Sequence, residues 1–215
     1  MSFPLINKNH PLVLASASPR RKQLLEQVGL PFISIPSHIE ENEEGNNPEL
    51  HTLILSEKKA KTVFQASKDQ WILGADTIVI IGKEILGKPR NQSEALSMLE
   101  RLSAKSHKVI TGFCILNPSG IIAHSEAVST KVEFKDLQRD EIESYVATGE
   151  PFGKAGSYAI QGIGTFMVKG IQGSYTNVVG LPIAALISAL EKIDALGSFP
   201  FSTLERSESW LKKAR

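Results

Sequence analysis

The sequence of 215 residues is short of cysteine, of net charge and of long apolar runs. Its single cysteine, Cys114, cannot form an intramolecular disulfide, and its apolar neighbours favour a buried free thiol in a reducing compartment. The 24 basic and 23 acidic side chains give a net charge of +1, which argues against a dedicated nucleic-acid binder. The longest nearly uncharged apolar stretch, 178–190, contains a proline and is shorter than the ~18 residues of a membrane span. We therefore expect a cytoplasmic globular protein without nucleic-acid or membrane partners.

Several catalytic signatures are also missing from the sequence. The histidines and the cysteine show neither H-E-x-x-H nor C-x-x-C spacing, so a zinc site is not predicted. There is no G-x-S-x-G nucleophile elbow and no complete dinucleotide-binding glycine fingerprint. The segment 82–89 resembles a phosphate-binding Walker A loop, but Pro89 stands where a magnesium-binding hydroxyl belongs. Lys88 in this Gly-Lys-Pro turn still offers a positive charge to a phosphate.

The hydrophobic pattern predicts an α/β protein with a mixed sheet, because strands alternate with helices and with hairpins. The expected strands are 12–15, 32–35, 71–81, 84–86, 107–116 and 121–134. The expected helices are one that begins at Pro19, then 49–66, 93–102, 139–147 and 182–196. Half of the 16 glycines fall in 149–180, which indicates a segment that needs backbone freedom. The tail 199–215 is compatible with a docking helix or with a frayed end.

Two arginines follow the motif Ser16-Ala-Ser-Pro in the first turn of a predicted helix. The N-terminus of a helix carries a partial positive charge, so Arg20 and Arg21 are unfavourable there unless an anion binds. Free backbone N–H groups, the hydroxyls of Ser16 and Ser18 and a guanidinium group together favour a phosphate or carboxylate site. The alternative is that the arginines are simply solvated and the serines only cap the helix.

Asp76 interrupts the apolar run 71–81, where a buried carboxylate without a partner would cost several kcal/mol. A metal ion, a lysine or a position at the end of the strand would compensate for this charge. The alternative is a structural aspartate that accepts backbone hydrogen bonds at a bulge beside Gly74.

Two further segments contain polar side chains suited to ligand binding. The acidic cluster of Glu40, Glu41, Glu43 and Glu44 is either a solvated loop or a source of oxygen ligands for Mg²⁺ or Mn²⁺. Gln161, in a glycine-rich connection after Lys154, carries both a donor and an acceptor, which suits the edge of uracil or thymine. A glutamine bonded to the loop backbone is the alternative.

Taken together, these residues resemble the Maf family of nucleotide pyrophosphatases over 12–190. The matching motifs are L-A-S-x-S-P-R-R at 14–21, L-A-x-x-K-A at 55–60, G-A-D-T at 74–77, G-K-P at 87–89, L-S-G-x-x-H-x-V-x-T at 102–111, G-E-P-x-x-K-A-G-x-Y-x-I-Q-G at 149–162 and V-x-G-L-P at 178–182. Ser56 and Ala104 depart from these motifs, each replacing one small residue by another.

The resemblance implies an elongated α/β fold of two lobes around a cleft, similar to inosine triphosphate pyrophosphatase and usually dimeric. On this basis 1–196 form one domain, and 197–215 are an extension about which the family gives no information. The implied reaction hydrolyses a nucleoside triphosphate to the monophosphate and pyrophosphate with a divalent metal, and three positions that distinguish its substrates, Arg20, Thr77 and Gln161, resemble the dTTP/UTP branch. The remaining implied roles are proton acceptor for Asp76, metal ligand for Glu41 and Asp76, and phosphate binding for Ser16, Arg21, Lys59, Lys88 and Lys154.

Two other functional hypotheses stay open at this point. The first is a nucleotide-sensing interaction protein with little catalysis, linked to cell division or septum control. The second is an acyl or sugar-phosphate hydrolase that uses the same anion site. A screen of triphosphate substrates distinguishes both from the pyrophosphatase.

Overall fold

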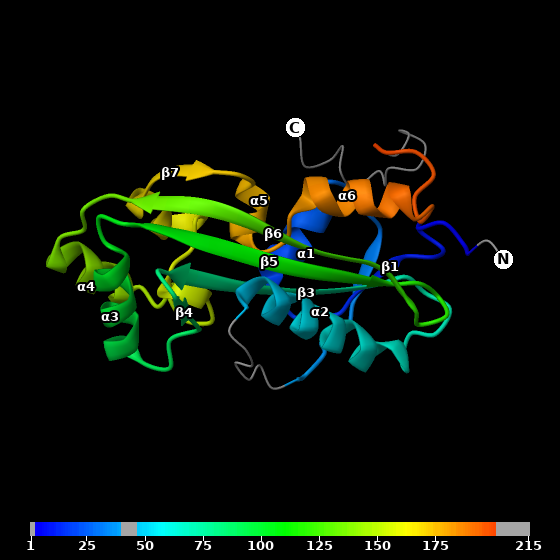
Figure 1. Ribbon diagram of the computed structural model, residues 1–215, viewed down its shortest axis with the longest axis horizontal. Coiled ribbons are helices and arrows are strands. Elements are labelled where there is room, and N and C mark those ends of the chain that lie inside the picture. The colour runs from blue at the N-terminus through cyan, green and yellow to red at the C-terminus, as the bar shows by residue number, and fades with distance from the viewer. Residues whose placement is uncertain (1–2, 40–46, 201–215) are drawn as a thin grey trace.

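The computed structural model describes residues 3–39 and 47–200, and their strands form one mixed sheet of seven strands with helices packed against it (Figure 1). The strands are β1 (Leu12–Leu14), β2 (Phe32–Ser34), β3 (Ile72–Ile81), β4 (Glu84–Leu86), β5 (Ser106–Leu116), β6 (Ile122–Phe134) and β7 (Val168–Gln172). The α-helices are α1 (Pro19–Gln27), α2 (Pro48–Phe64), α3 (Gln92–Leu102), α4 (Arg139–Ala147), α5 (Tyr175–Val179) and α6 (Ile183–Lys192). Two 3₁₀ helices, η1 and η2, span Ala155–Ser157 and Gly162–Met167. The predicted mixed α/β class is confirmed.

The sheet has the strand order β2-β1-β3-β5-β6-β7, and β4 pairs with β3. Among the described strands, only β1 makes parallel pairs, with β2 and β3, whereas the other pairs are antiparallel. The strand β1 pairs with β3 only as far as Leu73, and β4 begins to pair at Val79. Within the described residues, the edge of β3 from Ala75 to Ile78 is therefore left without a neighbouring strand on that side.

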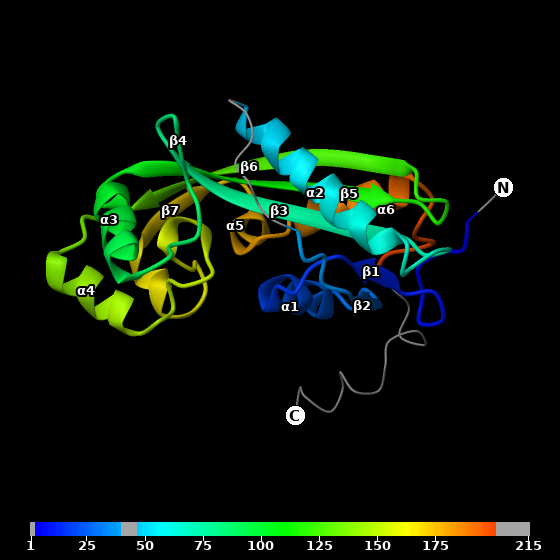
Figure 2. The same cartoon turned by 90° about the horizontal axis from the view of Figure 1, so that it is seen from below.

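The long strands β3 and β5 are buried on both faces, as the apolar run predicts (Figures 1 and 2). One face, with Leu73 and Phe113, packs against α1 and α6. The other face, with Ile72 and Cys114, packs against α2. Because successive side chains of a strand point to opposite faces, neighbouring residues of β3 are presented to different helices.

The helix α2 lies very close to the sheet, and two glycines make this approach possible. A Cβ atom at Gly74 would lie 2.0 Å from the carbonyl oxygen of Ser56 in α2. A Cβ atom at Gly112 on β5 would lie 2.6 Å from the side-chain oxygen of Thr52. The backbone of α2 therefore rests directly on β3 and β5, and this fixes the position of Lys59 near the end of α2.

Replacing Gly74 by alanine is expected to destabilise the protein by about 1–3 kcal/mol or more, because the added methyl group overpacks rigid backbone. The same change at Gly170 is the control, because a Cβ atom there meets no other atom within 4 Å. Urea unfolding of both variants measures the difference. Equal stabilities would show that α2 can move away from the sheet without cost.

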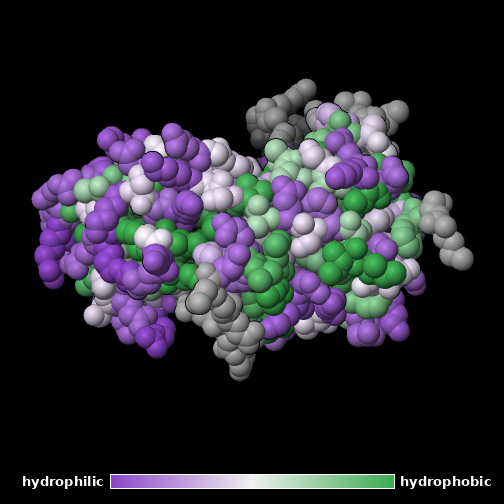
Figure 3. Space-filling view, in the orientation of Figure 1, coloured by the Kyte–Doolittle hydropathy of each residue, from purple (hydrophilic) through white to green (hydrophobic). Residues whose placement is uncertain are grey.

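The helices α3 and α4 lie together at one end of the molecule and cover a second hydrophobic cluster (Figure 1). On the face shown in Figure 3, hydrophilic residues dominate this end, and hydrophobic residues are more frequent along the middle. Several of its charged side chains are ion-paired, among them Arg139 with Glu143 and Lys135 with Glu141. The division into two lobes stays a prediction, as does the separate status of 197–215, of which residues 201–215 lie outside the described chain.

Two details of the sequence-based prediction are wrong. The last helix ends at Lys192 rather than at Leu196, because the chain reverses at Asp194 (φ +55°) and places Ala195 and Leu196 in the core. The glycine-rich segment also contains β7 and α5, which were not expected. Both are short and lack an apolar period; β7 is held by pairing with β6, and α5 by the Ser174 side chain, which accepts from the backbone N–H of Asn177.

None of the described helices has both the length and the apolar character needed to cross a bilayer.

Candidate active site

A cavity of about 420 Å³ opens beside the free edge of β3, beyond the end of β1. Its walls come from the β1–α1 connection, from α2, from the middle of β3 and from the glycine-rich segments 153–161 and 178–180. Nine of the ten residues to which the family resemblance assigns a role line this cavity: Ser16, Arg20, Arg21, Lys59, Asp76, Thr77, Lys88, Lys154 and Gln161. The tenth, Glu41, lies outside the described residues, like its acidic neighbours Glu40, Glu43 and Glu44.

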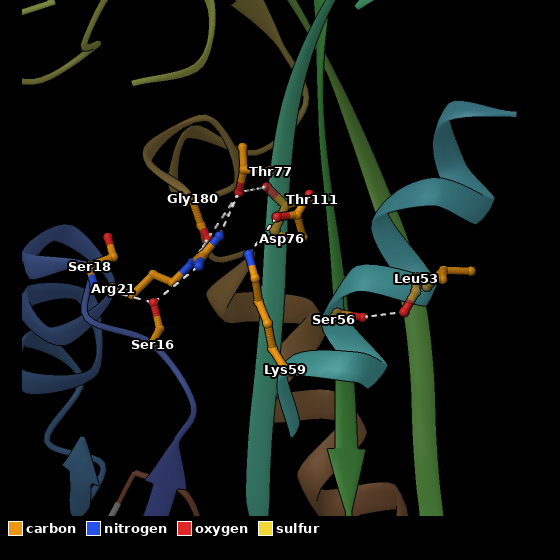
Figure 4. A network of polar contacts seen from close by, with 10 residues as sticks. All are labelled: Ser16, Ser18, Arg21, Leu53, Ser56, Lys59, Asp76, Thr77, Thr111 and Gly180. Atoms are coloured by element: carbon orange, nitrogen blue, oxygen red, sulfur yellow. Dashed lines mark hydrogen bonds and ion pairs between the residues drawn. The ribbon is translucent and has the colours of Figure 1, made fainter. Parts of the chain in front are cut away.

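Asp76 lies in the middle of β3 and is buried, with 5% of its surface exposed. Its Oδ1 atom is 2.7 Å from Nζ of Lys59, a residue of α2 that is itself 6% exposed (Figure 4). A lysine therefore compensates for the carboxylate, one of the three possibilities left open by the sequence. The strand-end and bulge alternatives are wrong, because β3 continues to Ile81 and pairs with β5 in unbroken register past Asp76.

The second oxygen of Asp76, Oδ2, accepts no hydrogen bond within the described part of the chain. One oxygen of this buried carboxylate is fixed by Lys59, and the other is available to a ligand. Such an arrangement suits a general base or a metal ligand. In the described ranges, Asp76 is also the only acidic residue among those that line the cavity, against five lysines and arginines. The electrostatic character of the cavity is thus strongly positive around one carboxylate.

Arg21 is held by both the N-terminal and the C-terminal parts of the chain. Its Nε donates to the carbonyl oxygen of Gly180 at 2.8 Å, its Nη1 to Oγ of Ser16 at 3.2 Å and its Nη2 to Oγ1 of Thr77 at 3.0 Å (Figure 4). The side chain is 8% exposed, so the interpretation of Arg21 as a solvated arginine is wrong. Ser16 also accepts from the backbone N–H of Ser18, and Ser18 occupies the N-cap position of α1 without a side-chain capping bond.

The hydroxyl of Thr77 has a defined hydrogen-bonding direction. Thr111 lies 2.9 Å from it and donates its own proton to the carbonyl oxygen of Asn177, since a carbonyl can only accept. The Thr77 proton is therefore directed to Thr111, or to the carbonyl oxygen of Gly180 at 3.4 Å, while Thr77 accepts from Arg21. A bound ligand meets Thr77 as a hydrogen-bond acceptor. Thr111 was not singled out by the sequence analysis, although it belongs to one of the quoted motifs, because its contact with Thr77 depends on the pairing of β3 with β5.

Arg20 and Lys154 are cations in partly desolvated positions. Burial lowers the pKa of Arg20. Burial, followed by the repulsion of Arg20, also lowers the pKa of Lys154 from the ordinary lysine value. The two cations thus line one cavity without full hydration and repel each other, and a bound polyanion would relieve this repulsion.

The affinity for a triphosphate is therefore expected to fall as the pH rises. This fall should begin at a lower pH than it would with a lysine of ordinary pKa. Lys154 is charged below its lowered pKa and neutral above it, so KM should begin to rise below the ordinary pKa of 10.5. Measurement of KM from about pH 7 to about pH 10 tests this. The Lys154→Arg variant should delay the rise, whereas Lys169→Arg, a change in a surface ion pair with Glu133, should not. Identical profiles in all three proteins would contradict the assignment.

Gln161 also lines the cavity, at the N-terminus of η2. Its side chain makes no hydrogen bond within the part of the chain that the structure describes, so the alternative of a glutamine bonded to its own loop finds no support there. His107 and Cys114 are both buried. Burial lowers the pKa of His107 to about 4 and raises that of Cys114 to about 12, so neither is suited to nucleophilic catalysis at neutral pH.

A scan against family models matches residues 11–193 to the Maf-like proteins. The chain belongs to the Maf family. This membership confirms the family resemblance read from the sequence motifs and extends it slightly at both ends.

This Maf protein aligns with nearly the whole length of its curated relatives. A dTTP/UTP pyrophosphatase of Ruminiclostridium cellulolyticum is 50% identical over 85% of this chain and 96% of its own. A protein of the same name from Geobacter sp. strain M21 is 50% identical over 89% of this chain and 100% of its own. One from Aquifex aeolicus is 40% identical over 87% of this chain and 98% of its own.

Among solved structures, a nucleoside-triphosphatase (dITP/XTP pyrophosphatase) of Mycobacterium abscessus matches this Maf protein with a TM-score of 0.42 and 15% sequence identity. The match covers 87% of this chain and 100% of that chain. A similarity of this degree carries no conclusion about activity.

Proposed function

We propose that this protein hydrolyses dTTP and UTP to the nucleoside monophosphate and pyrophosphate. The observation that carries the proposal is the cavity beside β3, in which five cationic side chains surround the single described carboxylate, Asp76. The relatives named dTTP/UTP pyrophosphatase, at up to 50% identity over almost their whole length, support the same reaction.

The phosphates are bound by the cationic residues of the cavity. Arg21 is fixed by Gly180, Ser16 and Thr77, so its guanidinium group is preorganised for a phosphate oxygen. The N-terminus of α1, directly beside it, adds backbone N–H groups and a partial positive charge. Lys88 and Lys154 line the same cavity and stabilise the departing pyrophosphate.

Asp76 acts as the general base of the hydrolysis. Lys59 fixes one carboxylate oxygen, and the other accepts a proton from water. The water oxygen forms a bond to the α-phosphorus while the bond between that phosphorus and the oxygen bridging to the β-phosphorus breaks. The pair of electrons leaves with pyrophosphate, and no covalent enzyme intermediate is formed.

The residues of the cavity fit a divalent cation that arrives with the substrate. Magnesium is commonly held by one or two carboxylates together with phosphate oxygens and water. Oδ2 of Asp76 has two lone pairs, so one is left for the cation when the other accepts the proton of water. No group of three acidic, histidine or cysteine residues able to hold a metal occurs in 3–39 or 47–200, so the protein does not offer a complete metal cage there. We propose Asp76 and Glu41 as ligands of Mg²⁺ or Mn²⁺, which when bound would neutralise part of the phosphate charge.

Recognition of the base is assigned to Arg20, Thr77 and Gln161. The Thr77 hydroxyl is directed to accept, and the Gln161 amide offers both a donor and an acceptor, a set that matches the N3–H and carbonyl groups of uracil and thymine. A base with the opposite pattern leaves these groups unpaired, which costs several kcal/mol in a desolvated site. We also propose a homodimer and a cytoplasmic location, both of which rest on the family resemblance and on nucleotide substrates.

The decisive experiment is a product-resolved screen. The protein is incubated with Mg²⁺ or Mn²⁺ and each common or 5-modified nucleoside triphosphate, and the products are separated by ion exchange. UMP with pyrophosphate is expected from UTP, and dTMP with pyrophosphate from dTTP. UDP with orthophosphate would show that a different bond is cleaved, and no turnover of any triphosphate would contradict the proposal.

A further inference from the structure

Glu150 lies just beyond the end of α4 and makes an unusual set of contacts for a surface carboxylate. Its Oε1 accepts from the backbone N–H of Gly164 at 2.9 Å and from the Tyr145 hydroxyl at 3.0 Å. Its Oε2 accepts from the backbone N–H of Ile163 at 3.1 Å. Burial by itself would raise the pKa of Glu150, but these hydrogen bonds lower it below the ordinary value. The group is therefore a charged cap on the N-terminus of η2, supplied from 13 residues away.

The segment that Glu150 fixes is the one that presents Gln161 to the cavity. Gln161 is the N-cap residue of η2, directly before Gly162 and the two N–H groups that Glu150 binds. On its other side, the backbone N–H of Ala159 donates to the Tyr145 hydroxyl at 3.2 Å. Tyr145 and Glu150 thus hold the chain both before and after Gln161.

The segment lies close against Glu150 and Tyr145. Gly162 adopts φ +74°, and a Cβ atom there would lie 2.6 Å from Oε2 of Glu150. A Cβ atom at Gly164 would lie 2.5 Å from the carbonyl oxygen of Ala159 and 2.8 Å from the Tyr145 hydroxyl. The two glycines permit the close approach, and the carboxylate keeps the segment in place.

The same residue also contacts the phosphate-binding end of the cavity. The Lys154 ammonium group donates to the backbone carbonyl oxygen of Glu150. Lys154 and Gln161 both line the cavity, so Glu150 contacts both a cation and the segment that carries the glutamine proposed to recognise the base. The Glu150 backbone carbonyl accepts from Lys154, and the Glu150 side chain accepts from the segment that follows Gln161.

We propose that Glu150 is a positioning residue for base selectivity, which acts through the backbone that carries Gln161. The inference rests on the proposed function. The Gln161 side chain makes no hydrogen bond within the described residues, so its direction toward a base depends on the backbone of 159–164. A polar group discriminates between bases only if it stays where the correct partner meets it, and a loosened segment lets Gln161 adapt to the wrong edge.

The experiment compares Glu150→Ala and Glu150→Gln with the wild type and with Glu143→Gln, a surface change in an exposed ion pair of α4. For each protein kcat/KM is measured with UTP and with CTP, whose base edge has the opposite hydrogen-bonding pattern. Inhibition by inorganic tripolyphosphate is measured as well, because this ligand has phosphates and no base. Tyr145→Phe is a second route to the same segment, since it removes the hydroxyl that contacts both Glu150 and Ala159.

Glu150→Ala should lower the ratio of kcat/KM for UTP to that for CTP by at least about tenfold, with tripolyphosphate inhibition unchanged within about twofold. Glu150→Gln should lie between it and the wild type, because an amide oxygen still accepts one N–H. Tyr145→Phe should shift the ratio in the same direction, and Glu143→Gln should leave it unchanged. An unchanged ratio in both Glu150 variants, or an equal loss with UTP, CTP and tripolyphosphate, would overturn the proposal. Failure of the wild type to hydrolyse UTP would instead remove the proposed function on which it rests.

Discussion

Replacing Asp76 by asparagine is expected to lower kcat for UTP hydrolysis by a factor of at least about 10²–10⁴, the usual contribution of a general base. An amide cannot accept the proton of the attacking water. Its oxygen can still accept a hydrogen bond from Lys59, so the local packing around β3 should persist. Binding of UTP, measured by calorimetry or by fluorescence titration, should therefore remain detectable. Steady-state kinetics with resolved products gives the change in kcat.

The matched control for this prediction is Asp140→Asn in the first turn of α4, a residue that does not line the cavity. Asp140 is exposed and should leave kcat unchanged. If the Asp76 variant turned over UTP at the rate of the control, Asp76 would not be the base. If it also lost all nucleotide binding, its main role would be in holding substrate or cation rather than in proton transfer.

Replacing Lys59 by methionine is expected to destabilise the protein by about 3–5 kcal/mol, because the carboxylate of Asp76 then stays buried without its cation. The pair is enclosed, with side-chain exposures of 8% for Lys59 and 7% for Asp76. The free energy of unfolding in urea measures the loss. Since such a loss approaches the total stability of many domains, the double variant Lys59→Met with Asp76→Asn completes the test.

The double variant should regain a substantial part of the lost stability, because it removes the charge that lacks a partner. The control on the same helix is Lys61→Met, which breaks an exposed ion pair with Glu57 and should change stability little. A Lys59 variant as stable as the Lys61 variant would show that the Lys59–Asp76 pair is well solvated. It would also contradict the conclusion that Lys59 compensates for the buried charge of Asp76.

Much of the fold could be predicted because its long elements have strong local patterns. The run of apolar residues that forms β3 and the stripe of Ala95, Leu99 and Leu102 in α3 both lie where the sequence places them. The segment from Val168 to Val179 could not be predicted in the same way. Its strand and helix are only five residues each, and they exist because β6 and the Ser174 cap stabilise them.

The candidate site shows the same distinction between local and long-range information. Asp76 stands out in the sequence because a charge interrupts an apolar run, and its local context alone demands compensation. That Lys59 supplies this compensation depends on glycine-mediated contact between α2 and β3, which no local pattern reveals. The contacts of Thr111 and Glu150 likewise arise only when distant segments meet, so sequence reasoning assigned neither a role.

The central claim is that water activated by Asp76 attacks the α-phosphorus of the nucleotide. Hydrolysis of UTP in water enriched in ¹⁸O, followed by mass spectrometry of both products, tests it most directly. We predict that the label appears in UMP and that pyrophosphate remains unlabelled. Label in pyrophosphate with none in UMP would place the attack on the β-phosphorus and would contradict this account of the site.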